Sequence, residues 1–107
     1  MLRILRQRQN VPAERENEAT FCIPEHVIAH RHEDGLVLLD SYQGLVFTAN
    51  RAAATIWEGV SQGRTVEAIA AQLNGETGLP WERILEDTRT YLHELQQWGL
   101  VFAGARS

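Results

Sequence analysis

The spacing of hydrophobic and polar positions changes once along this chain, near residue 50. Before that point the apolar residues form short alternating or branched runs, as in VIAHRH, LVLLD and LVFT, each bounded by turn-forming residues. Runs of this kind are typical of β-strands. After that point apolar residues recur every three or four positions, which is typical of amphipathic helices. The pattern predicts a small sheet followed by a helical half.

Three strands are predicted, over about residues 26–32, 36–40 and 45–48. An Asp-Gly pair separates the first two strands, and this pair is a strong hairpin signal. Tyr42-Gln43-Gly44 supplies the next turn, in which Gly44 is free to adopt a positive φ. Consecutive hairpins predict an antiparallel sheet, and we expect the third and shortest strand to lie at its edge.

Three helices are predicted after the sheet. Asn50 stands where the N-cap of the first helix belongs, ahead of an alanine-rich run with high helix propensity. Thr65 caps the second helix, and Asn74-Gly75 is expected to end it through a left-handed C-cap. Pro80 lies in the first turn of the third helix, which is predicted from about residue 81 to residue 98.

The third helix carries a long apolar arc that consists of Ile84, Leu85, Thr88, Tyr91, Leu92, Leu95 and Trp98. Residues 100–102 then form either a final short strand or a packed tail. Together these elements predict an α+β fold class, a winged-helix-like domain with a three-stranded antiparallel sheet followed by three helices. Trp57 and Trp98 are expected to close the hydrophobic centre. Trp81 is interpreted either as part of the core edge or as a contact residue.

Residues 1–20 show little apolar pattern and are expected to form a flexible arm ahead of a domain over residues 21–107. In this arm basic residues come first and acidic residues follow, namely Arg3, Arg6, Arg8, Glu14, Glu16 and Glu18. Such a segment is typical either of a disordered, solvated extension or of a tether to a partner or dimer mate.

The composition of the 107-residue chain argues against several classes of protein, including nucleic-acid-binding and membrane-spanning proteins. Its formal net charge is −4, whereas proteins that bind nucleic acids usually show a clustered basic face. The single cysteine, Cys22, excludes an internal disulfide and fits a reducing compartment. No apolar run approaches the roughly 20 residues of a membrane span. We therefore expect a cytoplasmic single domain with no membrane partner.

No constellation of side chains points to catalysis or to a metal. His26, His30 and His32 share one strand face, but such neighbours lie about 7 Å apart and no second cluster completes a ligand shell. We interpret them as exposed strand histidines and expect no metal and no cofactor. Cys22 lacks a recognisable base and orienting group, so we expect no enzyme activity.

The second and third helices, joined by a short turn, also resemble a helix-turn-helix. A helix that reads DNA usually presents basic and amide side chains. The third helix instead carries four acids, Glu82, Glu86, Asp87 and Glu94, against two bases, Arg83 and Arg89. This charge would repel DNA, so nucleic acid is not an expected partner. A winged-helix DNA-binding regulator is kept as an alternative function.

Residues 43–48 contain no Pro, Lys, Asp or Glu, the residues that usually block an exposed strand edge. An extended peptide could pair with this edge as an additional strand. The N-terminal arm, residues 100–102 or a second copy of the chain would cover the same edge equally well. A structural or oligomerisation subunit is therefore another alternative function.

The order and spacing of several motifs are similar to the PqqD family. The matching runs are DGLVLLDSYQGLVFTANRAAATIWEGVSQGRTVEAIAAQL and ILEDTRTYLHELQQWGLV, within about residues 26–102. The family includes the peptide chaperone of pyrroloquinoline quinone biosynthesis and leader-recognition proteins of lasso-peptide pathways. The resemblance implies a non-catalytic domain that binds the leader of a ribosomally synthesised precursor peptide as a strand added to the third strand. It also implies delivery to a peptide-modifying enzyme, namely a radical-SAM protein, a leader protease or a cyclase.

The resemblance also implies a peptide-binding site between the third strand and the third helix. By position, this site comprises Leu45, Val46, Phe47, Thr48, Ile84, Leu85, Thr88 and Tyr91. The chain departs from the family pattern in the length of residues 1–20 and at Thr88, where an apolar residue is commoner. The family's exchange of elements between chains implies a monomer or a domain-swapped homodimer.

Overall fold

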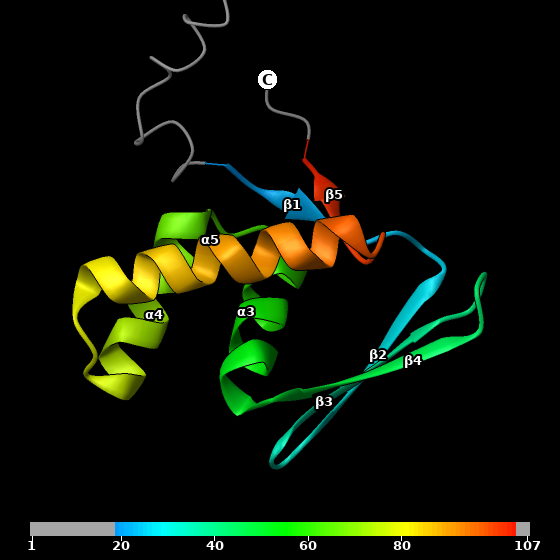
Figure 1. The fold of residues 1–107 in the computed structure, drawn as a ribbon, viewed down its shortest axis with the longest axis horizontal. Helices are drawn as coiled ribbons and strands as arrows, with labels where there is room; N and C mark the ends of the chain where they lie inside the picture. The colour runs from blue at the N-terminus through cyan, green and yellow to red at the C-terminus, as the bar shows by residue number, and fades with distance from the viewer. Residues whose placement is uncertain (1–18, 105–107) are drawn as a thin grey trace, which may run out of the picture.

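The fold is described for residues 19–104 in a computed structural model of the chain. Its elements are β1 (Phe21–Cys22), β2 (Val27–His32), β3 (Gly35–Asp40), β4 (Leu45–Asn50), α3 (Arg51–Ser61), α4 (Val66–Thr77), α5 (Trp81–Gln97) and β5 (Phe102–Ala103). The three helices lie together, and the three-stranded sheet extends away from them (Figure 1). This arrangement confirms the predicted α+β fold class. Within the described part of the chain, no helix is both long and apolar enough to cross a membrane.

The larger sheet has the order β2-β3-β4 and is antiparallel throughout. Its central strand aligns Leu38 with Ala29 of β2 and with Phe47 of β4. Leu36 and Leu38 are buried because they face the helices, whereas Leu39 points to the outer face. The third strand lies at an edge, as predicted. However, its six residues equal the length of β2 and β3, so the expectation of a shorter strand is wrong.

Side-chain caps start two of the helices as predicted. The side-chain oxygen of Asn50 accepts a hydrogen bond of 2.9 Å from the Ala53 N–H at the start of α3. The Thr65 hydroxyl accepts one of 3.1 Å from the Ala68 N–H at the start of α4. Because Asn50 is also the last residue of β4, this cap fixes the direction in which the edge strand meets the helical half.

The helix α4 ends later than predicted. It continues through Asn74 and Gly75 to Thr77, and Gly78 adopts the left-handed conformation with a φ of 72°. The Gly78 N–H donates to the Asn74 carbonyl at 2.9 Å, and the Asn74 side chain donates to the Leu79 carbonyl at 2.6 Å. Gly78 therefore forms the cap expected of Gly75, because a helix tolerates one interior glycine at a cost of about 1 kcal/mol.

The core lies between β3 and the helices, and it includes Trp57 but not Trp98. Trp57 is 5% exposed, as predicted, whereas Trp98 is 55% exposed. The prediction for Trp98 is wrong because Trp98 lies two helical turns after the half-buried Tyr91, on the flank of α5 that borders solvent rather than on the buried flank of Leu92. Gly99, with a φ of 77°, then turns the chain. Leu100 and Val101 occupy the buried positions instead.

A two-stranded ladder of β1 and β5 joins the two ends of the described chain (Figure 1). Next to it the Gly104 N–H donates to the Thr20 carbonyl at 2.8 Å, and the Val66 N–H donates to the Ala19 carbonyl at 3.0 Å. Residues 100–102 combine both predicted behaviours, since the first two are buried and the last begins β5. Most of the predicted N-terminal arm lies outside the described residues.

Candidate functional site

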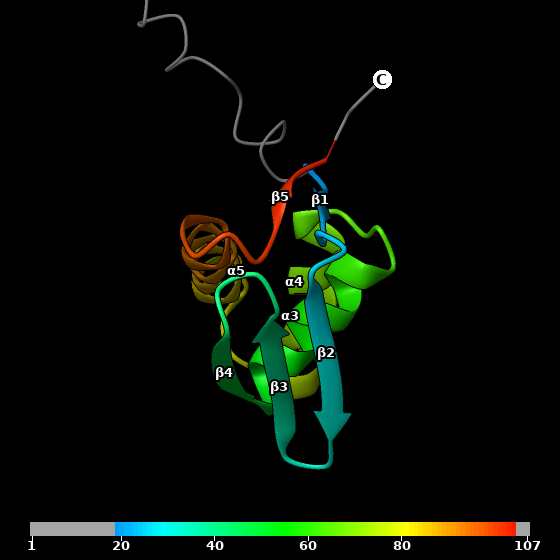
Figure 2. The same ribbon diagram turned by 90° about the vertical axis from the view of Figure 1, so that its right-hand side faces the viewer.

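β4 presents a strand edge on which no second strand pairs within residues 19–104. Its partner there is β3, and the C-terminal strand β5 pairs with β1 instead. The interpretation that residues 100–102 cover this edge is therefore wrong. Figure 2 shows β4 on the side of the sheet nearest α5. Such an edge carries a row of N–H and C=O groups that can pair with another extended chain.

The two edges of the sheet differ in their side chains. β4, with the sequence LVFTAN, contains no charged residue. β2, at the opposite edge, contains His30 and His32 and also Arg31, which forms an ion pair with Glu58 of α3. Charged side chains on an edge strand oppose pairing with a foreign chain. β4 is therefore the edge better suited to accept an added strand.

The side chains of β4 alternate between the two faces of the sheet. Those that lie opposite inward-facing residues of β3, and so face the helices, are Leu45, Phe47 and Ala49. Val46 and Thr48 point to the outer face and are exposed. The Phe47 ring meets the Trp98 ring edge to face, with centroids 5.3 Å apart and an angle of 67° between the planes. This contact connects the edge strand to the end of α5.

Two neighbouring hollows lie along α5, and together they form what we call the β4–α5 groove. The Trp98 hollow lies between β4 and α5, has a volume of about 150 Å³, and has walls that include Phe47, Ala49, Tyr91, Glu94, Leu95 and Trp98. The Thr88 hollow lies at the end of β4, where α5 faces α3 and α4. It has a volume of about 270 Å³, and its walls include Asn50, Ala53, Leu73, Ile84, Asp87, Thr88 and Tyr91. Tyr91 borders both hollows, so they are neighbours along the helix.

The four strand residues predicted as peptide contacts all lie on β4. Phe47 and Thr48 border the Trp98 hollow, although only the Phe47 side chain is on the face of the sheet towards the helices. Leu45 lies at the start of the strand and is 36% exposed, and Val46 is 63% exposed on the outer face. The strand therefore offers both side chains towards the groove and an accessible backbone.

Three of the four helix residues predicted as peptide contacts line the groove. Ile84, Thr88 and Tyr91 border the Thr88 hollow, whereas Leu85 is buried and borders neither hollow. The Thr88 hydroxyl donates to the Ile84 carbonyl at 2.7 Å. This polar group is therefore satisfied within the helix, and Thr88 adds no unpaired donor to the hollow.

Three groove residues of α5 were not predicted as contacts, namely Asp87, Glu94 and Leu95, and Trp98 just past the helix was also missed. The sequence pattern predicts a core position for Trp98, and the two acids indicate only a charge that opposes DNA binding. Asp87 precedes Tyr91 by four positions, and Glu94 follows it by three. Residues at these intervals share one flank of a helix. The helical spacing around Tyr91 is therefore the signal that could have identified Asp87 and Glu94 as groove residues.

The α5 wall of the groove carries negative charge. Burial raises the pKa of the Tyr91 phenol, and the Glu94 carboxylate raises it further. Because its pKa is raised, the Tyr91 hydroxyl stays protonated at neutral pH and can donate a hydrogen bond in the groove. The Asp87 carboxylate lies 3.6 Å from the Arg83 guanidinium, and both side chains are mostly exposed.

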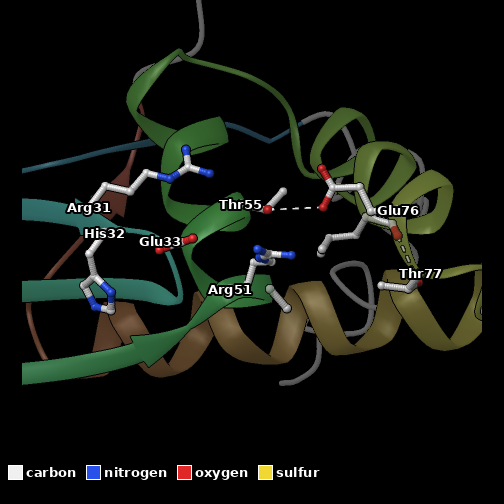
Figure 3. Close-up of a pocket in the computed structure, with 9 residues that line it drawn as sticks. Arg31, His32, Glu33, Arg51, Thr55, Glu76 and Thr77 are labelled. Carbon is white, nitrogen blue, oxygen red and sulfur yellow. Dashed lines mark hydrogen bonds between the residues drawn. The ribbon is translucent and has the colours of Figure 1, made fainter.

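A larger cavity of about 760 Å³ lies where the tip of the β2–β3 hairpin meets α3 and α4 (Figure 3). Its walls carry both signs of charge, including Arg31, Arg51 and Glu76. The Thr55 hydroxyl donates to the Glu76 carboxylate at 3.3 Å. Within residues 19–104, no group of three His, Cys, Asp or Glu side chains is placed to hold a metal ion. The sequence did not predict this cavity, and its mixed charges favour no single class of ligand.

Comparisons with known proteins agree with the observed fold. The profile of the family described as coenzyme PQQ synthesis protein D (PqqD) matches residues 35–101. A solved structure described as "TbiB1 in Complex with the TbiA(beta) Leader Peptide" is 24% identical and has a TM-score of 0.72, covering 78% of this chain and 98% of that one. Another, "Lasso peptide synthetase B1 complexed with the leader peptide", is 23% identical with a TM-score of 0.72, covering 78% and 99%. No curated protein matches the chain.

Proposed function

The chain belongs to the PqqD family, and from this premise we propose that it is a non-catalytic peptide-binding protein. It binds the leader of a ribosomally synthesised precursor peptide as a strand added to β4. It then presents the precursor to a modifying enzyme. The proposal includes no cofactor and places the protein in the cytoplasm.

The observation that carries this proposal is the unblocked edge of β4 beside an apolar groove. Main-chain hydrogen bonds to the edge provide affinity that does not depend on the peptide sequence. The hollows beside Phe47 and Thr88 then distinguish one peptide from another through its side chains. Two similar structures contain leader peptides, which supports the same class of ligand here.

We assign the peptide contacts to the predicted residues that border the edge or the groove, namely Leu45, Val46, Phe47, Thr48, Ile84, Thr88 and Tyr91. Leu85 is buried away from both hollows, so we assign it a packing role behind the groove.

The bound leader would act as a tether between the precursor and its enzyme. A flexible connection of this kind gives effective concentrations of the order of mM without a new catalytic group. The partner enzyme is a radical-SAM protein, a leader protease or a cyclase, since each of these acts on a precursor that still carries its leader.

Two proline variants test whether β4 is the docking edge. Hydrogen-bonded and non-hydrogen-bonded pairs alternate along an antiparallel ladder. The Asp40 carbonyl bonds towards β4 and the Ser41 N–H bonds towards β2, so by this alternation the N–H of Val46 on β4 and the N–H of Ala29 on β2 both point to the open side of their strands. Both residues are exposed. Val46→Pro and Ala29→Pro therefore each remove an open-edge N–H and restrict φ without breaking a hydrogen bond of the sheet, and Ala29→Pro is the matched control.

The probe is a labelled peptide selected from a random displayed library on the full-length protein. We expect Val46→Pro to weaken its binding by about tenfold or more, the effect of losing one or two main-chain hydrogen bonds. Ala29→Pro should retain the affinity, and thermal melts should show similar destabilisation of both variants. Equal loss of binding in the two variants would contradict strand addition on β4. Binding of a second copy instead would appear as a concentration-dependent mass in light scattering.

A further inference from the structure

We propose that the β4–α5 groove selects cationic leaders, in which two Lys or Arg residues lie two to four positions apart beside apolar residues. This inference rests on the function proposed above and specifies the chemistry of its ligand.

Each hollow of the groove has one charged residue among those that line it, and in both cases it is a carboxylate on α5. Glu94 borders the Trp98 hollow, and Asp87 borders the Thr88 hollow. The other residues around each hollow are apolar or neutral polar. A peptide side chain that fills either hollow is therefore placed beside a negative charge.

Neither carboxylate is firmly neutralised by another side chain of residues 19–104. Asp87 approaches Arg83 at 3.6 Å in a pair whose two side chains are about two-thirds exposed, and exposed pairs of this kind contribute little. Within the described residues, Glu94 forms no ion pair, and β4 contributes no basic residue to the opposite wall. A cationic peptide side chain can therefore pair with Glu94 directly and can compete with Arg83 for Asp87.

The spacing of the two carboxylates fits an extended chain. Asp87 and Glu94 are separated by seven helical positions, which is about 10.5 Å along the axis of α5. Same-face residues of a strand lie about 6.6 Å apart at a spacing of two and about 13 Å apart at a spacing of four. Lys and Arg span the remaining difference, because their long apolar stems pack in the hollows while the charged ends reach outwards.

Two double variants of α5 test this inference with the same change of net charge. Asp87→Asn with Glu94→Gln removes the two groove carboxylates. Glu82→Gln with Glu86→Gln removes two exposed carboxylates of the same helix that border neither hollow. Displayed random peptides are selected on the full-length wild type and on both variants. The strongest wild-type binder is then titrated by fluorescence anisotropy at low and high salt.

We expect wild-type and Glu82/Glu86 selections to enrich paired Lys or Arg, and the Asp87/Glu94 selection to lose this enrichment. The titrated peptide should bind the Asp87/Glu94 variant about three- to tenfold more weakly, as expected for two partly exposed ion pairs, and its affinity should depend less on salt. The Glu82/Glu86 variant should bind it as the wild type does.

The outcomes separate this inference from the proposed function. Selected peptides that are sensitive to Val46→Pro but show no cationic bias would overturn the charge preference and leave strand addition intact. Equal weakening in both double variants would also overturn it, because the effect would then come from overall charge. Selected peptides that are insensitive to Val46→Pro would contradict the proposed function itself.

Discussion

Asp40 is buried at the end of β3, and its carboxylate organises the turn that leads into β4. One oxygen accepts hydrogen bonds from the N–H groups of Tyr42 at 3.0 Å and Gln43 at 3.1 Å. The other accepts one of 2.7 Å from the Gln43 side chain. His26, which stacks on Tyr42, lies 3.8 Å from the same carboxylate. A single charged residue therefore fixes where the edge strand begins.

Lowering the pH is expected to loosen this turn. Burial alone would raise the pKa of Asp40, but hydrogen bonds from Gln43 and Tyr42, together with His26, outweigh burial and hold the pKa below 3.8. A carboxyl whose pKa is lowered on folding stabilises the protein above its unfolded pKa, and this contribution is lost as the pH falls through the folded pKa.

We therefore expect the urea midpoint of the wild type to fall as the pH drops below 3.8, with a smaller fall for Asp40→Asn. The variant should already be less stable than the wild type at neutral pH, where its side chain cannot accept charge-assisted hydrogen bonds. Parallel pH profiles for the two proteins would show that Asp40 does not carry the effect.

At the scale of the elements, the helix α5 carries both residues that hold the fold and residues that line the groove. Leu85 and Leu92 are buried and border neither hollow, while Tyr91 and Glu94 border the hollows. Ile84, Thr88 and Leu95 are buried and also line the hollows. Trp98, just past the end of the helix, covers one end of the groove through its contact with Phe47. The two functions therefore share some buried side chains of α5 but separate at Tyr91, Glu94 and Trp98.

The two tryptophans allow this separation to be measured. Trp57→Ala removes a 5% exposed side chain from the core, and we expect it to lower the free energy of unfolding by about 3–5 kcal/mol. Trp98→Ala removes a 55% exposed side chain, so we expect a much smaller loss of stability and a clear loss of affinity for a groove-bound peptide. Urea unfolding and peptide titration of both variants supply the comparison. A Trp98 variant that binds normally would remove the Trp98 hollow from the site.

The elements that sequence predicted correctly are those with local causes. The Asp-Gly hairpin and the Asn50 cap each act over a few residues, so their residue types were sufficient. The end of α4 was missed because both Gly75 and Gly78 can follow a helix, and only packing decides between them. Asp87 and Glu94 were missed as groove residues because their role depends on how α5 is rotated relative to β4. That rotation is set by tertiary contacts rather than by local pattern.

At the scale of the whole molecule, the β1–β5 ladder holds together the two ends of the segment formed by residues 19–104. Cys22 lies opposite Phe102, and the Gly104 N–H bonds to the Thr20 carbonyl. Hydrogen-bonded pairs alternate along an antiparallel ladder, so the Phe102 N–H is expected to face Cys22. The ladder is short, and its contribution to stability is correspondingly limited to a few hydrogen bonds.

Breaking this ladder should leave peptide binding intact. We expect Phe102→Pro to lower the thermal midpoint and to speed amide hydrogen exchange around Thr20 and Cys22, because the variant lacks the N–H at the ladder position. Phe102→Ala keeps that N–H and controls for loss of the half-exposed ring. Faster exchange in β4 of the proline variant would contradict this separation between the ladder and the groove.

Because β1 and β5 lie side by side, anything attached near residue 19 or near residue 104 starts from the same patch of the surface (Figure 1). In a fused polypeptide, a recognition domain of this shape could stand before or after an enzyme with nearly the same geometry. The order of the two domains in such a fusion would then make little difference to how the bound peptide reaches the enzyme.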